Sequence, residues 1–475
     1  MSHCLLASCQ ASGQHGTVAA TRQRLSGGED NLSREAHGGL SRHLLARLAS
    51  RLSANQLAEN DRGSLRGHPL SLEYGDRVRW HRGSVARRAE RIVAEKRPRP
   101  SVARVSLPSW NRPGEGGGRM ELELPTLGKI SREVFDQIIL PNLGAPSPQV
   151  LVPPQHGVDV GIVDLGNGLV MAVTTDPVFV VPAYGWERAA WFAIHILASD
   201  AATSGLRPTY MAIDLNLPLE ITAEELALLW TTMHRVCAEL GIAIVAGHTA
   251  RYEGCNYPMV GGAAVLAIGP ADRYVTPKMA RVGDLVVVTK GAAIEAAGLF
   301  AVSFPERIAA AYGREFAERA QELFWQMTVV EDALTAVSVG VRDDGVTAMH
   351  DATECGVFGG LVEVAEASGV GMRIEQERII LREDVAKICE LFGMNPYAAI
   401  SEGTLIITVR PHKAEALLAA LATKGIAASI VGEVVPPERG LTLVVEGREQ
   451  RLEHPRVDPF WAAFGRAMAE AQQAG

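Results

Sequence analysis

Three aspartates and two short polar motifs bring together the residue types that could do chemistry in this sequence. The aspartates are Asp159, Asp176 and Asp200, and the motifs are Gly247-His248-Thr249 and His350-Asp351-Ala352-Thr353-Glu354. A carboxylate beside an apolar element costs free energy unless it is paired or bound to a cation. Each of these residues is therefore either structural or a ligand, and the elements around it must decide which.

Asp159 and Asp176 flank a predicted β-hairpin. Two short apolar strands, over 161–165 and 169–174, are joined by Gly166-Asn167-Gly168, which is a strong hairpin signal. The pairing of these strands brings Asp159, before the first strand, and Asp176, after the second, toward the same edge.

Asp200 falls near the end of a predicted helix over about 186–204 and close to the buried side of that helix. A strand over 211–217 follows, and Thr222 with Glu225 forms a capping box that opens the next helix. The residues alone leave a capped structural aspartate and a ligand as equal alternatives for Asp200.

The motif Gly247-His248-Thr249 ends an apolar run over 242–245, and a second apolar run over 259–268 follows a polar loop. This pattern predicts a strand, a site-bearing loop and a second strand. Glycine at 247 lets the backbone turn or approach a ligand, so His248 and Thr249 would project from the end of the strand. A plain polar hairpin loop is the alternative, and the motif taken by itself favours it.

In the second half, polar residues follow two further predicted strands. Lys290-Gly291 ends a strand over 285–289 and opens a small-residue helix, where a lysine can meet a phosphate, although no Walker motif is present. The motif that begins at His350 lies at the end of a short strand beside a helix over 357–367, the usual ligand edge of an α/β layer. A helix N-cap is an equal alternative for Asp351 and Thr353.

Strands alternate with amphipathic helices in both halves of the chain. This alternation predicts an α/β (α+β) protein with two domains, over 120–275 and 276–450, and a tail helix within 451–475. A helix over 127–140, capped by Ser131, opens the first domain.

Residues 1–119 differ in charge from the rest of the chain. They carry 20 Lys and Arg against 10 Asp and Glu, whereas the remainder carries 26 against 44. An Arg-rich arm could bind nucleic acid or an anionic surface. Because the segment lacks sustained periodicity, we interpret it as a disordered or misannotated extension before Met120 and expect no nucleic-acid partner.

The composition argues against several protein classes. No run of about 18 apolar residues is free of charges and breakers, so no membrane span is expected. The six cysteines form no CxxC pair, which argues against a zinc site and against a disulfide framework. We expect a cytoplasmic protein.

The motifs GVDVGIV, TTDPVF, ASDAATSG, RPTYMAIDL, AGHT, HDATECG and SEGTL occur in this order over 125–445. Their combination resembles the aminoimidazole ribonucleotide (AIR) synthetase (PurM-like) superfamily, in particular its hydrogenase-maturation HypE-like and AIR-synthase-related branch. The resemblance implies a two-domain fold, in which the N-terminal domain forms a dimeric β-barrel-like interface beside a C-terminal α/β domain. It also implies a homodimeric enzyme of the ligase, kinase or dehydratase type, which uses ATP and Mg²⁺ to activate a substrate oxygen by phosphoryl transfer.

The resemblance also implies a role for each matching position. It implies that Mg²⁺ is held by Asp159, Asp176 and Asp200. It implies that the nucleotide is contacted by Lys129, Thr175, Gly247, Thr249 and Lys290. It implies that the reacting group is faced by His350, Asp351, Thr353 and Glu354. We expect His248 to hydrogen-bond a phosphate or the substrate, because Mg²⁺ prefers oxygen ligands.

Three departures from the family pattern bear on the reaction. His248 stands where the family has an aspartate, and Cys355 breaks a glycine pair. The sequence ends AEAQQAG, without the cysteine on which carbamoyl-dehydrating members carry their substrate. The substrate is therefore left as an unidentified small molecule or protein-borne group, and a non-catalytic nucleotide-binding or scaffold dimer of the same fold is the alternative.

Overall fold

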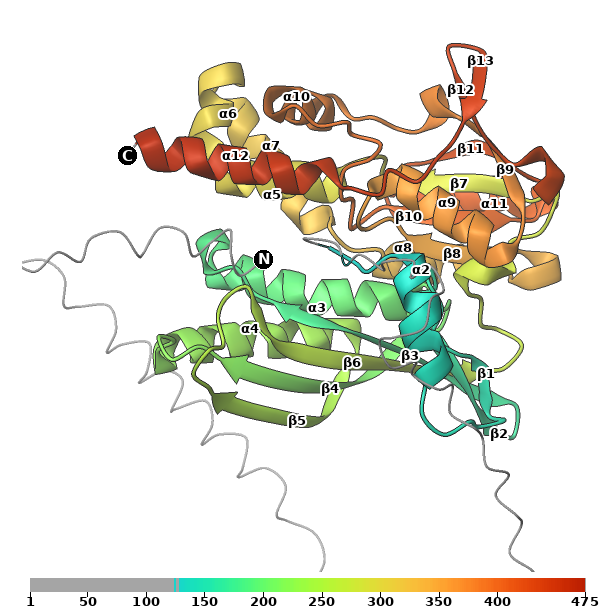
Figure 1. Cartoon of the computed structure of the whole chain (residues 1–475), viewed down its shortest axis with the longest axis horizontal. Coiled ribbons are helices and arrows are strands. Elements are labelled where there is room, and N and C mark those ends of the chain that lie inside the picture. The colour runs from blue at the N-terminus through green and yellow to red at the C-terminus, as the bar shows by residue number, and fades with distance from the viewer. Residues whose placement is uncertain (1–123, 125–127, 475) are drawn as a thin grey trace, which may run out of the picture. The chain divides into compact units, whose positions relative to one another are not determined.

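The computed structural model describes residue 124 and residues 128–474, which belong to one compact unit. These residues form two β-sheets with helices packed on them (Figure 1), which confirms the predicted α/β class. The first sheet ends at Pro270, and the second begins at Leu285. The domain boundaries themselves stay a prediction, and the predicted extension 1–119 lies outside the described residues.

The first sheet has six strands in the order β1-β2-β3-β6-β4-β5. They are β1 (Val150–Val152), β2 (Gly161–Gly166), β3 (Leu169–Phe179), β4 (Pro208–Leu217), β5 (Ala243–Arg251) and β6 (Met259–Pro270). β2 and β3 form the predicted hairpin, with Gly166, Asn167 and Gly168 all at positive φ. β4 and β5 run parallel, whereas the other neighbours are antiparallel.

Two helices, α3 (Trp186–Ala202) and α4 (Ala223–Leu240), lie along one face of this sheet (Figure 1). α4 begins with the predicted capping box of Thr222 and Glu225. Met211 and Leu215 of β4 are buried in the same apolar cluster as the two helices, whereas Tyr210 is exposed. The sheet therefore has one covered face and one open face.

The second sheet has seven strands in the order β13-β12-β9-β11-β7-β10-β8. They are β7 (Leu285–Thr289), β8 (Val346–Asp351), β9 (Gly371–Glu375), β10 (Leu405–Val409), β11 (Ala428–Val435), β12 (Leu441–Val445) and β13 (Arg448–Arg451). β7 lies between β10 and β11, and its valines are fully buried. A run of valines without polar alternation is typical of a strand covered on both faces.

The remaining helices mostly follow the predicted pattern. They are α5 (Ile294–Ser303), α6 (Pro305–Tyr312), α7 (Arg314–Ala320), α8 (Val330–Ala336), α9 (Gly356–Ser368), α10 (Glu383–Phe392), α11 (Ala414–Thr423) and α12 (Pro459–Ala474). The helical region predicted over 305–337 is broken at Gly313, whose φ of 89° ends α6. One apolar cluster joins α3 and α4 to α8 and β10, so the two sheets are connected through a shared core.

The segment before the first sheet differs from its predicted form. Ser131 caps α2 (Arg132–Val134) as expected, by accepting a hydrogen bond from the backbone N–H of Val134. The α-helix predicted over 127–140 is nevertheless wrong beyond Val134, because a π-helical turn and a 3₁₀ turn follow. Ile138 and Ile139 are exposed, so among the described residues no apolar surface holds the expected helical face in place.

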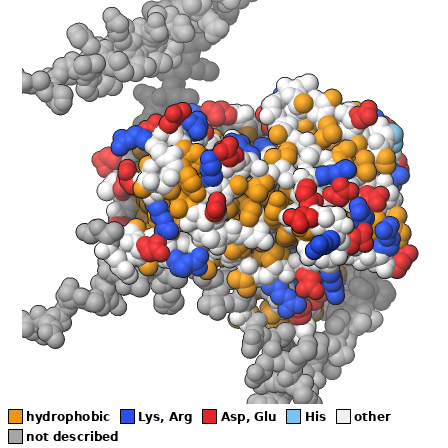
Figure 2. Space-filling view, turned by 90° about the horizontal axis from the view of Figure 1, so that it is seen from above, with side chains coloured by type: hydrophobic (Ala, Val, Ile, Leu, Met, Phe, Trp, Pro, Cys, Tyr) orange, Lys and Arg blue, Asp and Glu red, His pale blue; other side chains and the backbone are white. Residues whose placement is uncertain are grey.

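The surface in Figure 2 carries acidic and basic side chains interspersed with apolar ones. This face shows no large area of a single charge sign. Among the described residues, no helix has both the length and the apolar character needed to cross a membrane.

Candidate active site

Asp351, at the end of β8, is the most deeply buried carboxylate of the candidate site. Its side chain is 1% exposed, and neither of its oxygens has a hydrogen-bond partner among the described residues. Burial is the main cause that raises the pKa of Asp351 to about 7, followed by the charge of Asp159. The N-cap alternative is wrong for Asp351 and Thr353, because α9 is preceded by Cys355 and has no side-chain cap.

His350 is held between two carboxylates from different elements. Its Nδ1 lies 2.9 Å from Asp159, and its Nε2 lies 2.8 Å from Glu363 of α9. Burial opposes the charged imidazole, but the two carboxylates together raise the pKa of His350 well above its usual value. Burial alone would raise the pKa of Glu363, yet the hydrogen bond and charge of His350 lower it to about 2. His350 is therefore an imidazolium with both nitrogens engaged, and it cannot ligate a metal or accept a proton in this arrangement.

The three predicted metal-binding aspartates converge on the same place as Asp351. A carboxylate oxygen of Asp159, one of Asp351 and a ring nitrogen of His350 lie within 4.8 Å of one another. Burial and then the charges of Asp351, Asp176 and Asp159 raise the pKa of Asp200 well above its usual value. Burial likewise raises the pKa of Asp176. We call Asp159, Asp176, Asp200 and Asp351 the carboxylate cluster, and the mutual repulsion of its negative charges favours the binding of a cation.

Lys129 is the predicted nucleotide contact that the structure brings to this cluster. Its Nζ donates a hydrogen bond to the hydroxyl of Thr353 at 3.2 Å, and its backbone N–H donates to Glu354 at 3.1 Å. The residue as a whole is exposed, but its ammonium faces the cluster. Desolvation opposes the charge, yet Glu363, Asp200, Asp176 and Asp159 together raise the pKa of Lys129.

The motif Gly247-His248-Thr249 lies elsewhere in the chain. The prediction of a loop there is wrong, because β5 runs through the motif and pairs His248 with Asp214 of β4. His248 is exposed and its Nε2 lies 2.9 Å from the hydroxyl of Tyr252. Gly247 and Thr249 are also exposed on this edge strand, as is Thr175 on β3. Among the described residues of a single chain, His248 has no contact with the carboxylate cluster.

The ammonium of Lys290 is fully hydrogen-bonded to other groups of the protein. Its Nζ donates to the carbonyls of Thr328 at 2.6 Å and Gly403 at 3.0 Å, and to the carboxylate of Asp332 at 2.7 Å. All three ammonium protons are thereby used, so the expected phosphate contact has no donor left.

Three buried glutamates near the cluster were not predicted as site residues. Glu363 orients His350, and Glu402 is 1% exposed with both oxygens unpartnered among the described residues. Glu295 accepts a hydrogen bond from the backbone N–H of Glu402 at 2.9 Å, and burial raises its pKa to about 8. In the sequence, Glu295 is the one charged residue of its helix, whereas Glu363 shares a helix of small and apolar residues with Glu366. That pattern was the available signal, because a lone acid on a buried face requires a partner.

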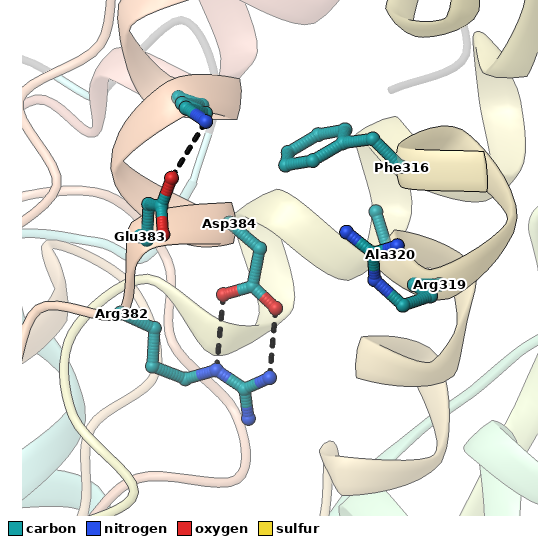
Figure 3. A pocket seen from close by; sticks show the side chains of 7 residues that line it. Phe316, Arg319, Ala320, Arg382, Glu383 and Asp384 are labelled. Atoms are coloured by element: carbon teal, nitrogen blue, oxygen red, sulfur yellow. Dashed lines mark hydrogen bonds and ion pairs between the residues drawn. The ribbon is translucent and has the colours of Figure 1, made fainter. Parts of the chain in front are cut away.

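A separate hollow of about 420 Å³ lies between α7 and α10 (Figure 3). Its walls contain the ion pairs of Arg382 with Asp384 and of Lys387 with Glu383. The hollow holds none of the predicted site residues, and its lysine and its Arg382 are already paired. It is therefore not our candidate site.

Comparison with known proteins gives matches over most of the described chain. The AIR synthase related protein family matches in two stretches, with its N-terminal domain over residues 157–268 and its C-terminal domain over 281–444. The carbamoyl dehydratase HypE of Rhizobium leguminosarum bv. viciae is 27% identical over 274 residues, which are 56% of this chain and 73% of that protein. A putative hydrogenase expression/formation protein of Methanocaldococcus jannaschii is 24% identical over 345 residues, or 70% of this chain and 96% of that protein. The crystal structure of Escherichia coli HypE, a hydrogenase maturation protein, superposes with a TM-score of 0.51 at 26% identity and covers 61% of this chain and 87% of its own.

Proposed function

Because the chain belongs to the AIR synthase related family, we propose that it is an enzyme that uses ATP and Mg²⁺ to phosphorylate and so activate an oxygen of its substrate. The observation that carries this proposal is the unpartnered, buried carboxylate of Asp351 inside the carboxylate cluster. A buried carboxylate without a hydrogen-bond partner costs several kcal/mol unless it is neutralised or meets a cation. Similarity to carbamoyl dehydratases supports a reaction of this type.

The cluster suits Mg²⁺ in the chemistry of its donors. Asp159, Asp176, Asp200 and Asp351 offer carboxylate oxygens, which are the ligands that Mg²⁺ prefers. The imidazole of His350 is excluded as a ligand because both nitrogens are hydrogen-bonded. Bound Mg²⁺ would neutralise charge on the triphosphate and on the transferring phosphoryl group.

The residues of the chain then have distinct tasks in the proposed reaction. The ammonium of Lys129, held by Thr353, is placed to meet a phosphate oxygen. His350 fixes the orientation of Asp159 through their 2.9 Å contact. The substrate oxygen attacks the γ-phosphorus of ATP, the bond from that phosphorus to the β,γ-bridging oxygen breaks, and ADP leaves. The chain itself need supply only positioning and charge, which suits phosphoryl transfer.

We further propose that the protein acts as a homodimer through the open face of the first sheet. Tyr210, Val245, Met259 and Ile268 are apolar residues of this sheet that are between 38% and 60% exposed. β5 is also an edge strand with unpaired backbone groups. A second copy would cover both features and would bring the motif around His248 to an interface.

Isothermal titration calorimetry of the full chain with ATP and Mg²⁺ tests the proposed function. We expect saturable heat for the wild type, no heat for Asp176→Ala, and a strong loss of affinity for Asp351→Asn. Asp343→Asn is the control, because that carboxylate is 88% exposed and pairs with Arg281 at the surface. Absence of heat with the wild type would refute the proposal.

The second candidate, a non-catalytic nucleotide-binding dimer, is favoured by one observation. His248 stands on an exposed edge strand and offers no carboxylate to the cluster. Both candidates predict nucleotide binding, so turnover must separate them. ADP release above background with amide or carbonyl compounds supports the enzyme, whereas tight binding without release supports the second candidate.

A further inference from the structure

Glu354 is held on both of its carboxylate oxygens by residues far apart in the chain. Its Oε1 accepts a hydrogen bond from the indole N–H of Trp461 at 3.0 Å. Its Oε2 accepts one from the backbone N–H of Lys129 at 3.1 Å. A carboxylate held in this way links two segments that are far apart in the chain.

The residue before Lys129 shows how closely the two segments meet. Gly128 has a φ of +93°, and a Cβ at this position would lie 2.7 Å from Oε1 of Glu354. The side chain of Lys129 then continues past Thr353 toward the carboxylate cluster. The position of the Lys129 ammonium therefore depends on where the carboxylate of Glu354 is held.

Residues at the start of α12 hydrogen-bond to the segment that contains Glu354. Asp458 is buried, accepts the backbone N–H of Cys355 at 2.7 Å, and also accepts that of Phe460 at 2.8 Å. Phe460 is 2% exposed and packs edge-on against Phe300 at 5.5 Å. The beginning of α12 is thus anchored in the core while it bonds to two consecutive residues, Glu354 and Cys355.

We propose that Asp458 and Trp461 form a C-terminal clamp that positions Lys129 through Glu354. In this proposal Glu354 is a positioning residue, because it acts through Lys129. The clamp deepens the proposed function, and its expected effect on nucleotide binding rests on that proposed function. The structural link from α12 to residues 128–129 is independent of the proposed function.

Hydrogen exchange of the ligand-free full chain, followed by mass spectrometry, tests the link directly. Trp461→Phe keeps an aromatic ring against Phe460. It removes the N–H donor together with part of the ring, and the Trp325→Phe control matches the loss of ring. We expect exchange in a peptide that spans 128–134 to accelerate roughly tenfold, because the acceptor of the Lys129 amide loses its second anchor. Peptides from β7 should keep their wild-type rates. Unchanged exchange over 128–134 would overturn the clamp, and so would faster exchange confined to α12.

Two further variants keep the test decisive. Gly128→Ala strains the same contact from the opposite side and should accelerate the same peptide, even if Trp461→Phe were to unfold α12. Trp325→Phe is the matched control, because that indole packs against Trp191 at 5.2 Å and should leave 128–134 unchanged.

Calorimetry with ATP and Mg²⁺ separates the clamp from the proposed function. We expect Trp461→Phe to weaken nucleotide binding about tenfold without a change in thermal midpoint beyond that of Trp325→Phe. If exchange accelerates but the wild type binds no nucleotide, the proposed function fails and the clamp stands. If exchange accelerates and the affinity is unchanged, Glu354 does not position Lys129 for the nucleotide and the clamp proposal fails.

Discussion

Replacing Glu363 by glutamine should separate the charge of this residue from its shape. Glu363 lies on α9 with its side chain 10% exposed, and it accepts the Nε2 proton of His350 at 2.8 Å. Burial raises its pKa, but the bond to His350 outweighs burial and lowers the pKa to about 2 from 4.5. At 1.36 kcal/mol for each pKa unit, this difference corresponds to about 3 kcal/mol of stability at pH 7.

The direction of the pH dependence follows from the lowered pKa. Stability from such a carboxylate is fully present above the unfolded pKa of about 4.5 and is lost as the pH falls toward about 2. Glu363→Gln should therefore lower the free energy of unfolding by about 3 kcal/mol at pH 7 and by only about 1.4 kcal/mol at pH 3. Urea titrations at pH 7, 5, 4 and 3, in the presence of a chelator, measure how the difference in unfolding free energy between wild type and variant decreases as the pH falls.

Glu366→Gln provides the control on the same helix. Glu366 pairs with Arg132 at 2.8 Å, but both side chains are about half exposed, so this change should cost less than about 0.5 kcal/mol at any pH. A cost below about 1 kcal/mol for Glu363→Gln at pH 7, or a gap that widens toward acid pH, would refute the assignment of His350 as an imidazolium between two carboxylates.

Three further predictions concern other residues. Lys290→Met should lower the free energy of unfolding by about 3–5 kcal/mol, because it leaves the buried Asp332 unpaired, and should leave the affinity for ATP unchanged by calorimetry. His248→Asp, at an exposed position, should shift stability by less than about 0.5 kcal/mol, and a change in Mg²⁺ dependence on this substitution would show that the edge strand reaches a metal in the dimer. Burial raises the pKa of Glu295 to about 8, so its contribution is present below about pH 4.5 and is lost as the pH rises through 8. Glu295→Gln should therefore be more stable than the wild type at pH 8, with the gap closing near pH 5 in thermal denaturation.

Elements with strong local signals were predicted correctly from the sequence. The turn at Gly166-Asn167-Gly168 and the capping box of Thr222 and Glu225 depend on neighbouring residues only, and both are present. The α-helix predicted over 127–140 was wrong beyond Val134, because Ile138 and Ile139 found no described surface to bury against. Burial decides the fate of a short helix more than propensity does.

The candidate site was predictable where a motif has a local meaning. Asp159 and Asp176 were expected at one edge of the hairpin. In the structure the negative charges of both contribute to raising the pKa of Asp200 in the carboxylate cluster. The roles of Glu363 and Trp461 were not predictable, because each depends on a partner at the end of another element. The hydrogen bonds of Lys290 were not predictable for the same reason, since its three acceptors come from distant parts of the chain.

The central place of β7 in the second sheet has a consequence for how the protein is made. Thr289 at its end bonds to Leu405 of β10, 116 residues later in the chain. At a synthesis rate of about 5–20 residues per second, β7 waits roughly 6 to 23 seconds for this partner to be translated. During that interval its valines have no strand beside them, and an unpaired apolar strand is prone to aggregation. We therefore expect the yield of folded protein to depend on chaperones that shield β7 until translation has passed β10 and β11.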